Sequence, residues 1–232
     1  MLADHPVDRE PDEMNMNVIR GAAASLIVAC GAIAPAHAAT VLFTDDFGGG
    51  GYALDTDPTN WDTVNGTVDW LAPSNDYSIS CADAVTGCVD LDGSVQDAGT
   101  MFTSGTFNLV AGTTYQLTAY VSGNQRGNLS PPLNAADSLA FGFLSGGNPV
   151  LQPGATGSIA TILPNQPFTL ISLSFTPTTS VLASIFFETG GGDNVGPILD
   201  NVSLAAVPLP AAAWLLLSGL VGFAALGRRK VS

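Results

Sequence analysis

The sequence predicts an all-β protein: a two-sheet jelly-roll sandwich with an N-terminal signal helix and a short C-terminal transmembrane helix. Gly and Pro together number 41 of 232 residues, and charged residues make up only 11%, a composition typical of short strands joined by many turns. Residues 41–204 alternate apolar and polar positions with a period of two, and no ten-residue stretch among them has helical periodicity. Instead, each end of the chain carries an apolar run.

The first apolar run has the parts of a secretory signal. Within residues 16–38, Arg20 supplies the positive charge, an apolar stretch follows, and Ala36-His37-Ala38 forms a small-residue cleavage site. A buried helix, the alternative, would need no such site. We therefore assign residues 1–38 to a signal peptide and expect export by the Sec machinery.

The first thirteen residues are acidic and suit a signal poorly. Our hypothesis is that translation starts at Met14 or Met16. N-terminal sequencing of the precursor tests it.

Residues 39–206 are expected to form the sandwich. Two runs of same-parity apolar residues each predict one buried face of a strand. They are Tyr115, Leu117, Ala119 and Val121, and then Leu139, Phe141 and Phe143. The segments 168–175 and 181–188 predict two further strands, separated by turn residues.

Cys81 and Cys88 are the only cysteines of the exported part, because Cys30 leaves with the signal. An even pair in an oxidising compartment predicts one disulfide. Two free thiols are the alternative.

Charge and residue usage exclude several functions. Between residues 39 and 207, Arg126 is the only base among fifteen Asp and Glu, and such a surface repels nucleic acid. The same segment lacks His and Lys, which serine-triad, zinc-histidine and Schiff-base chemistry require. We expect no enzyme, with a glycosidase that uses only carboxylates as the surviving catalytic alternative.

Residues 207–232 form the C-terminal tail. Two prolines precede an apolar run at about 211–226, which would span about 24 Å as a helix. The basic cluster that follows should stay in the cytoplasm. The tail resembles the VPLPA variant of the PEP-CTERM sorting tail, and the residues that match are Val207, Pro208, Leu209, Pro210, Ala211, Arg228, Arg229 and Lys230.

This resemblance implies processing by an exosortase, with the tail as a transient membrane anchor that is then removed. Where the more common form has Pro-Glu-Pro, this chain has Leu209. Composition alone does not decide between a permanent anchor and a cleaved label.

The segments "VLFTDDFGGGG", "GCVDLDGS" and "GPILDNVSL" resemble the galactose-binding-like jelly roll found in PEP-CTERM proteins and related carbohydrate-binding modules. This resemblance implies a structural calcium ion between the first strand and a late Asp. Asp200 has the parity of Ile198 and Val202, and a buried carboxylate needs a partner or a metal.

Asp45 or Asp46 together with Asp200 is therefore the candidate calcium site. The alternative is that these carboxylates accept backbone N–H groups. "VDLDGS" also resembles a calcium loop but lacks its later ligands, so we interpret it as a strand that runs into a turn.

Candidate ligand-binding residues are aromatic rings near amide groups: Trp61, Trp70, Tyr77, Asn124, Gln125 and Arg126. An aromatic face can stack on a sugar ring while polar neighbours bind its hydroxyls. Both tryptophans could equally fill the sandwich, and Arg126 could be the centre of an internal ion pair.

We expect an exported bacterial surface or extracellular-matrix protein that binds glycans of the exopolysaccharide matrix without catalysis. A structural coat protein without a defined ligand is the alternative, and a glycosidase is the second.

Overall fold

The computed structural model describes residues 38–49, 51–94, 98–126, 128–130, 135–190 and 193–208. Within these ranges the chain forms strands and no helix, so no described helix is long and apolar enough to cross a membrane. The strands are β1 (Thr40–Asp45), β2 (Trp61–Val64), β3 (Asp69–Leu71), β4 (Cys88–Asp90), β5 (Thr100–Thr103), β6 (Phe107–Leu109), β7 (Thr114–Ser122), β8 (Asp137–Ser145), β9 (Asn148–Pro149), β10 (Thr156–Ile162), β11 (Thr169–Phe175), β12 (Val181–Thr189) and β13 (Ile198–Val207).

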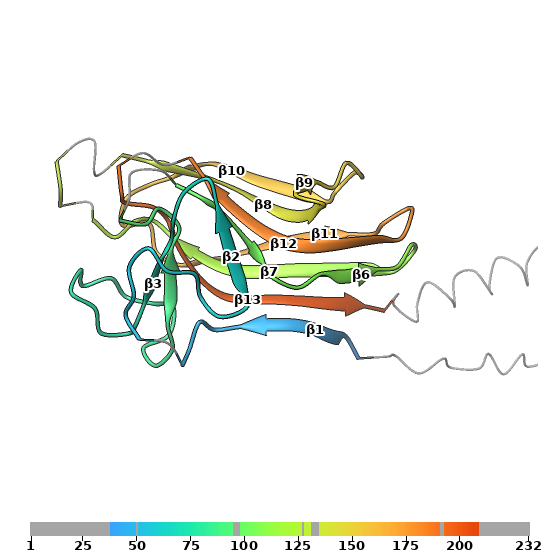
Figure 1. Ribbon diagram of the computed structural model, residues 1–232, viewed down its shortest axis with the longest axis horizontal. Helices are drawn as coiled ribbons and strands as arrows, with labels where there is room; N and C mark the ends of the chain where they lie inside the picture. The colour runs from blue at the N-terminus through green and yellow to red at the C-terminus, as the bar shows by residue number, and fades with distance from the viewer. Residues whose placement is uncertain are drawn as a thin grey trace, which may run out of the picture.

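The strands form two antiparallel sheets packed as a jelly-roll sandwich, which confirms the predicted fold class (Figure 1). The first sheet has the order β11-β7-β13-β4-β3, and β1 also pairs with β13. The second sheet has the order β10-β8-β12-β5-β2, with β6 beside β12 and β9 beside β8. Successive strands often lie in different sheets, so distant segments become neighbours.

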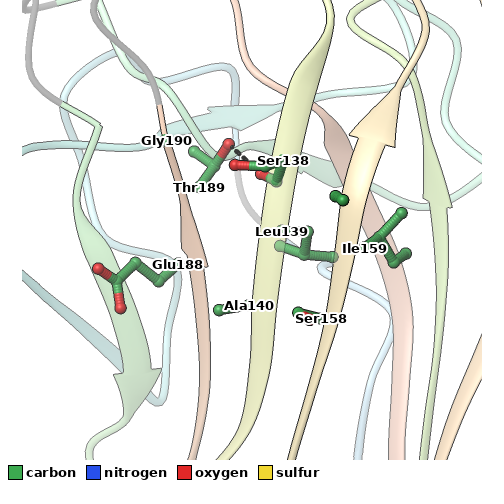
Figure 2. A pocket seen from close by; sticks show the side chains of 9 residues that line it. Ser138, Leu139, Ala140, Ser158, Ile159, Glu188, Thr189 and Gly190 are labelled. Carbon is green, nitrogen blue, oxygen red and sulfur yellow. Dashed lines mark hydrogen bonds between the residues drawn. The ribbon is translucent and has the colours of Figure 1, made fainter.

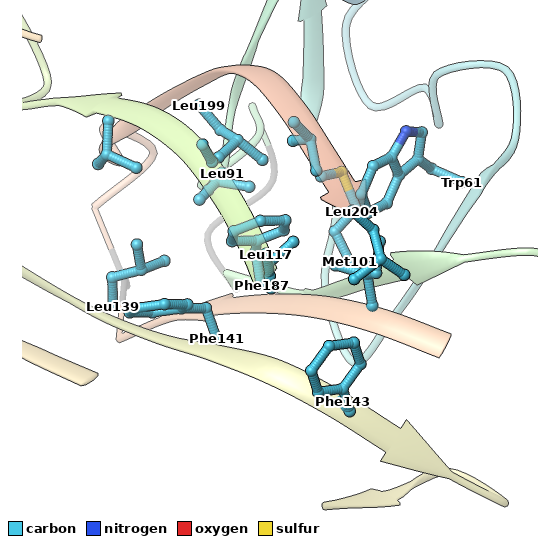
Figure 3. Packing of buried hydrophobic residues seen from close by; sticks show 14 of the residues in the cluster. Trp61, Leu91, Met101, Leu117, Leu139, Phe141, Phe143, Phe187, Leu199 and Leu204 are labelled. Atoms are coloured by element: carbon cyan, nitrogen blue, oxygen red, sulfur yellow. The ribbon is translucent and has the colours of Figure 1, made fainter. Parts of the chain in front are cut away.

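The predicted buried faces are confirmed. Leu117 and Ala119 of β7 are buried, as are Leu139 and Phe143 of β8. Figure 3 shows Leu117, Phe141, Phe143 and Phe187 between the sheets with Trp61 and Met101. Burying one such phenyl ring contributes about 2 to 3 kcal/mol, so this layer holds the sheets together.

Strand β13 contains a bulge that the alternation pattern does not show. Its register against β7 shifts between Asp200 and Ser203, and Asn201 has a φ of 50°. The extra residue reverses the parity of the strand. Leu199 and Val202 both face the main core, whereas Ile198 belongs to a separate small cluster.

The predicted environment of Asp200 is therefore corrected. The carboxylate is fully buried, but the bulge breaks its shared parity with Val202. Its Oδ2 accepts the Ala82 N–H at 2.8 Å, so it lies beneath the loop that the cysteines close.

The predicted disulfide between Cys81 and Cys88 is confirmed. The loop that it closes packs tightly, because a side chain at Gly87 would clash with the carbonyl oxygen of Phe47. "VDLDGS" begins in β4 and continues into a turn, as interpreted from the sequence.

The chain enters β1 and leaves β13 on the same side of the sandwich (Figure 1). Val207 ends β13, and Pro208 is the last described residue. The predicted signal helix, the predicted helix at 211–226 and the sorting residues from Leu209 onward lie outside the described residues.

Candidate ligand-binding surface

The outer face of the second sheet carries a hollowed surface in which hydroxyl and carboxylate groups lie among apolar ones. Ile185 and Phe187 of β12 point into the core, so Ser184 and Glu188 point outward by alternation. On β8, the small residues Ser138 and Ala140 have the outward parity. Small side chains between larger neighbours leave space above the sheet.

Strand register aligns four outward residues in a row. Glu188 pairs with Thr100 on one side and with Ala140 on the other, and Ala140 pairs with Ser158 of β10. Figure 2 shows Glu188 on one side of a hollow and Ser158 on another strand across it. A strip of outward residues, polar except at Ala140, therefore crosses four strands.

Two open hollows adjoin along this strip, and Glu188 lines both. One, of about 340 Å³, is lined by small and hydroxyl-bearing residues of β8, β10 and β12. The other, of about 260 Å³, includes Phe102, Leu144 and Pro149 beside Thr100 and Ser184. The volumes suit ligands the size of one or two sugar rings.

The groups in these hollows are suited to binding a polyol. Within the described part of the chain, the exposed Glu188 carboxylate makes no hydrogen bond, so both oxygens can accept from a ligand. The Ser158 hydroxyl can donate and accept, whereas the Ser184 hydroxyl donates to the Gly105 carbonyl and is left to accept. Phe102 is half-buried and offers an apolar surface.

The sequence alone does not reveal this surface. The alternation in "VLASIFFE" predicts a strand but does not show which residues of other strands lie beside its outward side chains. Pairing Glu188 with Ala140 and Ser158 depends on the order of strands, which the sequence does not state.

The two tryptophans that were predicted to stack on a ligand pack in or against the core of the sandwich. Trp61 is only 2% exposed, and its Nε1 donates to Asp45 at 2.8 Å. Trp70 is half-buried against the core, and its Nε1 donates to the Phe47 carbonyl. Because the ring of Trp61 is enclosed, it cannot stack on a sugar. The alternative prediction, that this tryptophan fills the interior of the sandwich, is correct for Trp61.

Four of the other predicted ligand-binding residues gather at the end of the sandwich opposite the chain termini. The Arg126 guanidinium lies 4.4 Å from the centre of the Tyr77 ring, and its Nη2 is 3.7 Å from Asp90 Oδ2. Gln125 joins Ser80 to Ser122. The predicted alternative for Arg126, an internal ion pair, is thus present.

Asn124 is fully buried and belongs to the same end. Its Nδ2 lies 3.4 Å from Asp137 Oδ2, and its Oδ1 accepts the Arg126 N–H. It therefore supports the fold and is not exposed to a ligand.

Buried carboxylates concentrate at this end. Burial raises the pKa of Asp137 to about 7, and the neighbouring Asp193 adds to the rise. Burial also raises the pKa of Asp90 well above its ordinary value, although backbone N–H groups and Arg126 oppose the rise. Asp200, beneath the disulfide loop, has a pKa raised to about 6 by burial.

The candidate calcium carboxylates already have partners. Asp45 accepts the Phe47 N–H and the Trp61 Nε1–H, and Asp46 accepts the Gly48 N–H. Both oxygens of Asp200 accept backbone N–H groups. Among the described residues, no group of three or more Asp, Glu, His or Cys has a metal-binding arrangement. Calcium at these carboxylates stays a prediction.

The fold defines the class of protein as a jelly-roll sandwich, and solved structures share it. No family model matches the sequence, and no match is found among the curated proteins. A cyclase from Fischerella sp. TAU superposes with a TM-score of 0.51 at 14% identity, covering 74% of this chain and 98% of that one. The Stig cyclase Fisc of the same organism, solved with an indole ligand, gives 0.50 at 16% identity, covering 74% and 99%.

The CBM22-1 xylan-binding domain of Paenibacillus barcinonensis Xyn10C is also similar, with a TM-score of 0.40 at 13% identity, covering 75% of this chain and 99% of that domain. At 14% and 16% identity, the two Fischerella structures show a shared fold alone and carry neither ligand nor reaction to this chain.

Proposed function

We propose that this protein binds glycans without catalysis, on the outer face of the second sheet. The observation that carries the proposal is the pair of adjoining hollows that share Glu188. Their carboxylate, hydroxyl groups and phenyl ring match the hydroxyls and the apolar faces of sugar rings.

The arrangement favours binding over hydrolysis. Glycosidases use two carboxyl groups about 5 to 9.5 Å apart. Among the described residues that line the two hollows, Glu188 is the sole carboxylate.

The test is co-sedimentation of the protein with exopolysaccharide from the cells that produce it. Glu188→Gln keeps the shape of the side chain and removes its charge, so binding should weaken about 10- to 100-fold, as expected for loss of a hydrogen bond to a charged group. Asp57→Asn, at an exposed loop position outside the hollows, is the matched control and should bind as the parent does. Equal affinity of all three proteins would refute this location.

We further propose that the protein is exported and sorted to the cell surface or matrix, with an exosortase and the Sec machinery as processing partners. The proposal depends on the N-terminal signal and on the tail that begins at Val207. A size shift of the product between cells with and without an active exosortase tests it.

A structural coat protein is the second candidate, favoured by the burial of Trp61. Absence of binding to any fraction of the matrix, from protein shown to be folded, would favour this second function.

A further inference from the structure

Among the residues that the structure describes, the end of the sandwich where both termini leave the fold carries no charged residue. The sequence stretches 38–44, 98–125, 138–187 and 201–208 contain neither acid nor base. These stretches include the turns that follow β6, β8 and β11, which lie on the side of the termini in Figure 1. They also include the loop after β9, whose Gln152 is hydrogen-bonded to Thr178 in the turn after β11. In a chain with a net charge of −14, this distribution separates one uncharged end from an acidic remainder.

We call this surface the charge-free end and define it as loops 110–113, 150–153 and 176–180 with the outer residues of β1 and β13. Hydrogen bonds join its loops. Gly112 donates to the Pro177 carbonyl, and Gln152 accepts from Thr178 and donates to the Thr179 carbonyl. The loops thus form one connected surface.

Large apolar side chains project from this end. Leu151 is 96% exposed, Leu182 60% and Val41 59%, and Val110 is also exposed. All four residues belong to the charge-free end: each lies in one of its loops or within two residues of a strand terminus there. Single exposed apolar residues are ordinary on protein surfaces, but here they coincide with the absence of charge.

The acidic remainder lies at the other end. Asp45 ends β1 away from the termini, and Asp137 begins β8 there. Asp90 pairs with the first residue of β13. About 30 Å separates the two ends, from the nine residues of β8 at roughly 3.3 Å each.

We infer that the charge-free end rests on a lipid bilayer surface, with its exposed Leu and Val side chains in the interface. Apolar side chains enter this region favourably, whereas carboxylates oppose entry. The acidic end would then face away from the lipid headgroups, where repulsion by anionic lipids is weakest.

The apolar run that follows Pro208 in the sequence favours a lipid bilayer, rather than another protein, as the partner of this surface. The fold ends at Pro208 on this surface, and the sequence reaches the apolar run 211–226 two residues later. A bilayer that accepted this run would lie against the charge-free end. The inference does not require glycan binding. One hollow reaches the turn after β8 through Gly146 and Gly147, but Leu151 and Leu182 line neither hollow.

The experiment places a reporter at each end of the full chain. Leu151→Trp lies on the charge-free end, and Leu163→Trp, at a position 58% exposed, follows β10 at the acidic end. Both variants are reconstituted into phosphatidylcholine vesicles with and without lipids brominated in the acyl chain, which quench tryptophan on contact. The three native tryptophans are common to both, so the parent's quenching is subtracted.

We expect the added emission of Leu151→Trp to be mostly lost with brominated lipid, and that of Leu163→Trp to be unchanged. Adding Leu182→Asp to Leu151→Trp should weaken the quenching, and adding Leu170→Asp should not. Equal quenching at positions 151 and 163 would overturn the inference. So would a blue shift of Leu151→Trp without quenching, because that result means a second protein copy covers this end.

Discussion

Ionisation of Asp137 should make the protein less stable as the pH rises. The carboxyl group is 6% exposed and has Asn124 beside it. Burial and the charge of Asp193 raise its pKa from 3.8 to about 7 in the folded protein. In the unfolded chain it returns to an ordinary value near 3.9.

The sign follows from proton binding. Between about pH 4 and pH 7 the folded protein holds a proton on Asp137 that the unfolded chain releases, so the free energy of unfolding falls as the pH rises. At about 1.4 kcal/mol per pKa unit, the full difference for this group is about 4 kcal/mol. This is an upper value, because water that enters on ionisation relieves part of it. Asp90 and Asp200 act in the same direction.

Asp137→Asn removes the ionisation and keeps the shape. At pH 8 the variant should be more stable than the parent by up to about 4 kcal/mol, and below pH 4 the two should be nearly equal. With a urea slope of about 2 kcal/mol per molar, the midpoint at pH 8 rises by up to about 2 M. Urea unfolding of residues 38–208, followed by circular dichroism from pH 3.5 to 8, measures this difference.

The control is Asp57→Asn, at an exposed loop position, whose profile should parallel that of the parent. If Asp137→Asn also parallels the parent across this range, the reasoning about the buried carboxyl is wrong.

Three other predictions concern the same fragment. Replacing Cys81 and Cys88 by Ser opens a loop of about eight residues and should lower the free energy of unfolding by about 2.5 kcal/mol, and an unchanged urea midpoint would contradict this. Phe187→Ala, at a fully buried position, should cost about 3 to 5 kcal/mol, whereas Val85→Ala, at a position 82% exposed, should leave the midpoint unchanged. If the calcium prediction is right, chelation should lower the melting temperature and added calcium should restore it; identical melting curves would dismiss the ion.

The sequence was sufficient for features that depend on short-range pattern. Alternation identified the inward faces of β7 and β8, and spacing identified the disulfide. Asp200 does not share a face with Val202 as alternation predicts, because the strand bulges between Asp200 and Ser203, where Asn201 has a positive φ. A single Asn within a strand pattern gives little warning of a bulge.

The candidate site depends on long-range pairing and was therefore missed. Residue 102 comes next to residue 186, and residue 140 next to residue 158, through strand order. Tryptophans in a polar stretch suggested a ligand platform, but Trp61 finds its hydrogen-bond acceptor in Asp45, sixteen residues earlier. Polar neighbours in sequence need not be neighbours in space.

The position of β13 has a mechanical consequence for a chain held by its C-terminus. Force applied beyond Pro208 pulls this strand along its own axis. On one side Ser203 to Val207 pair with β7, and on the other side Val202 to Ala206 pair with β1. Those hydrogen bonds lie across the direction of pull, so they share the load and must fail together. A pull on the end of β13 therefore loads the sandwich in shear, the direction in which paired strands resist separation most.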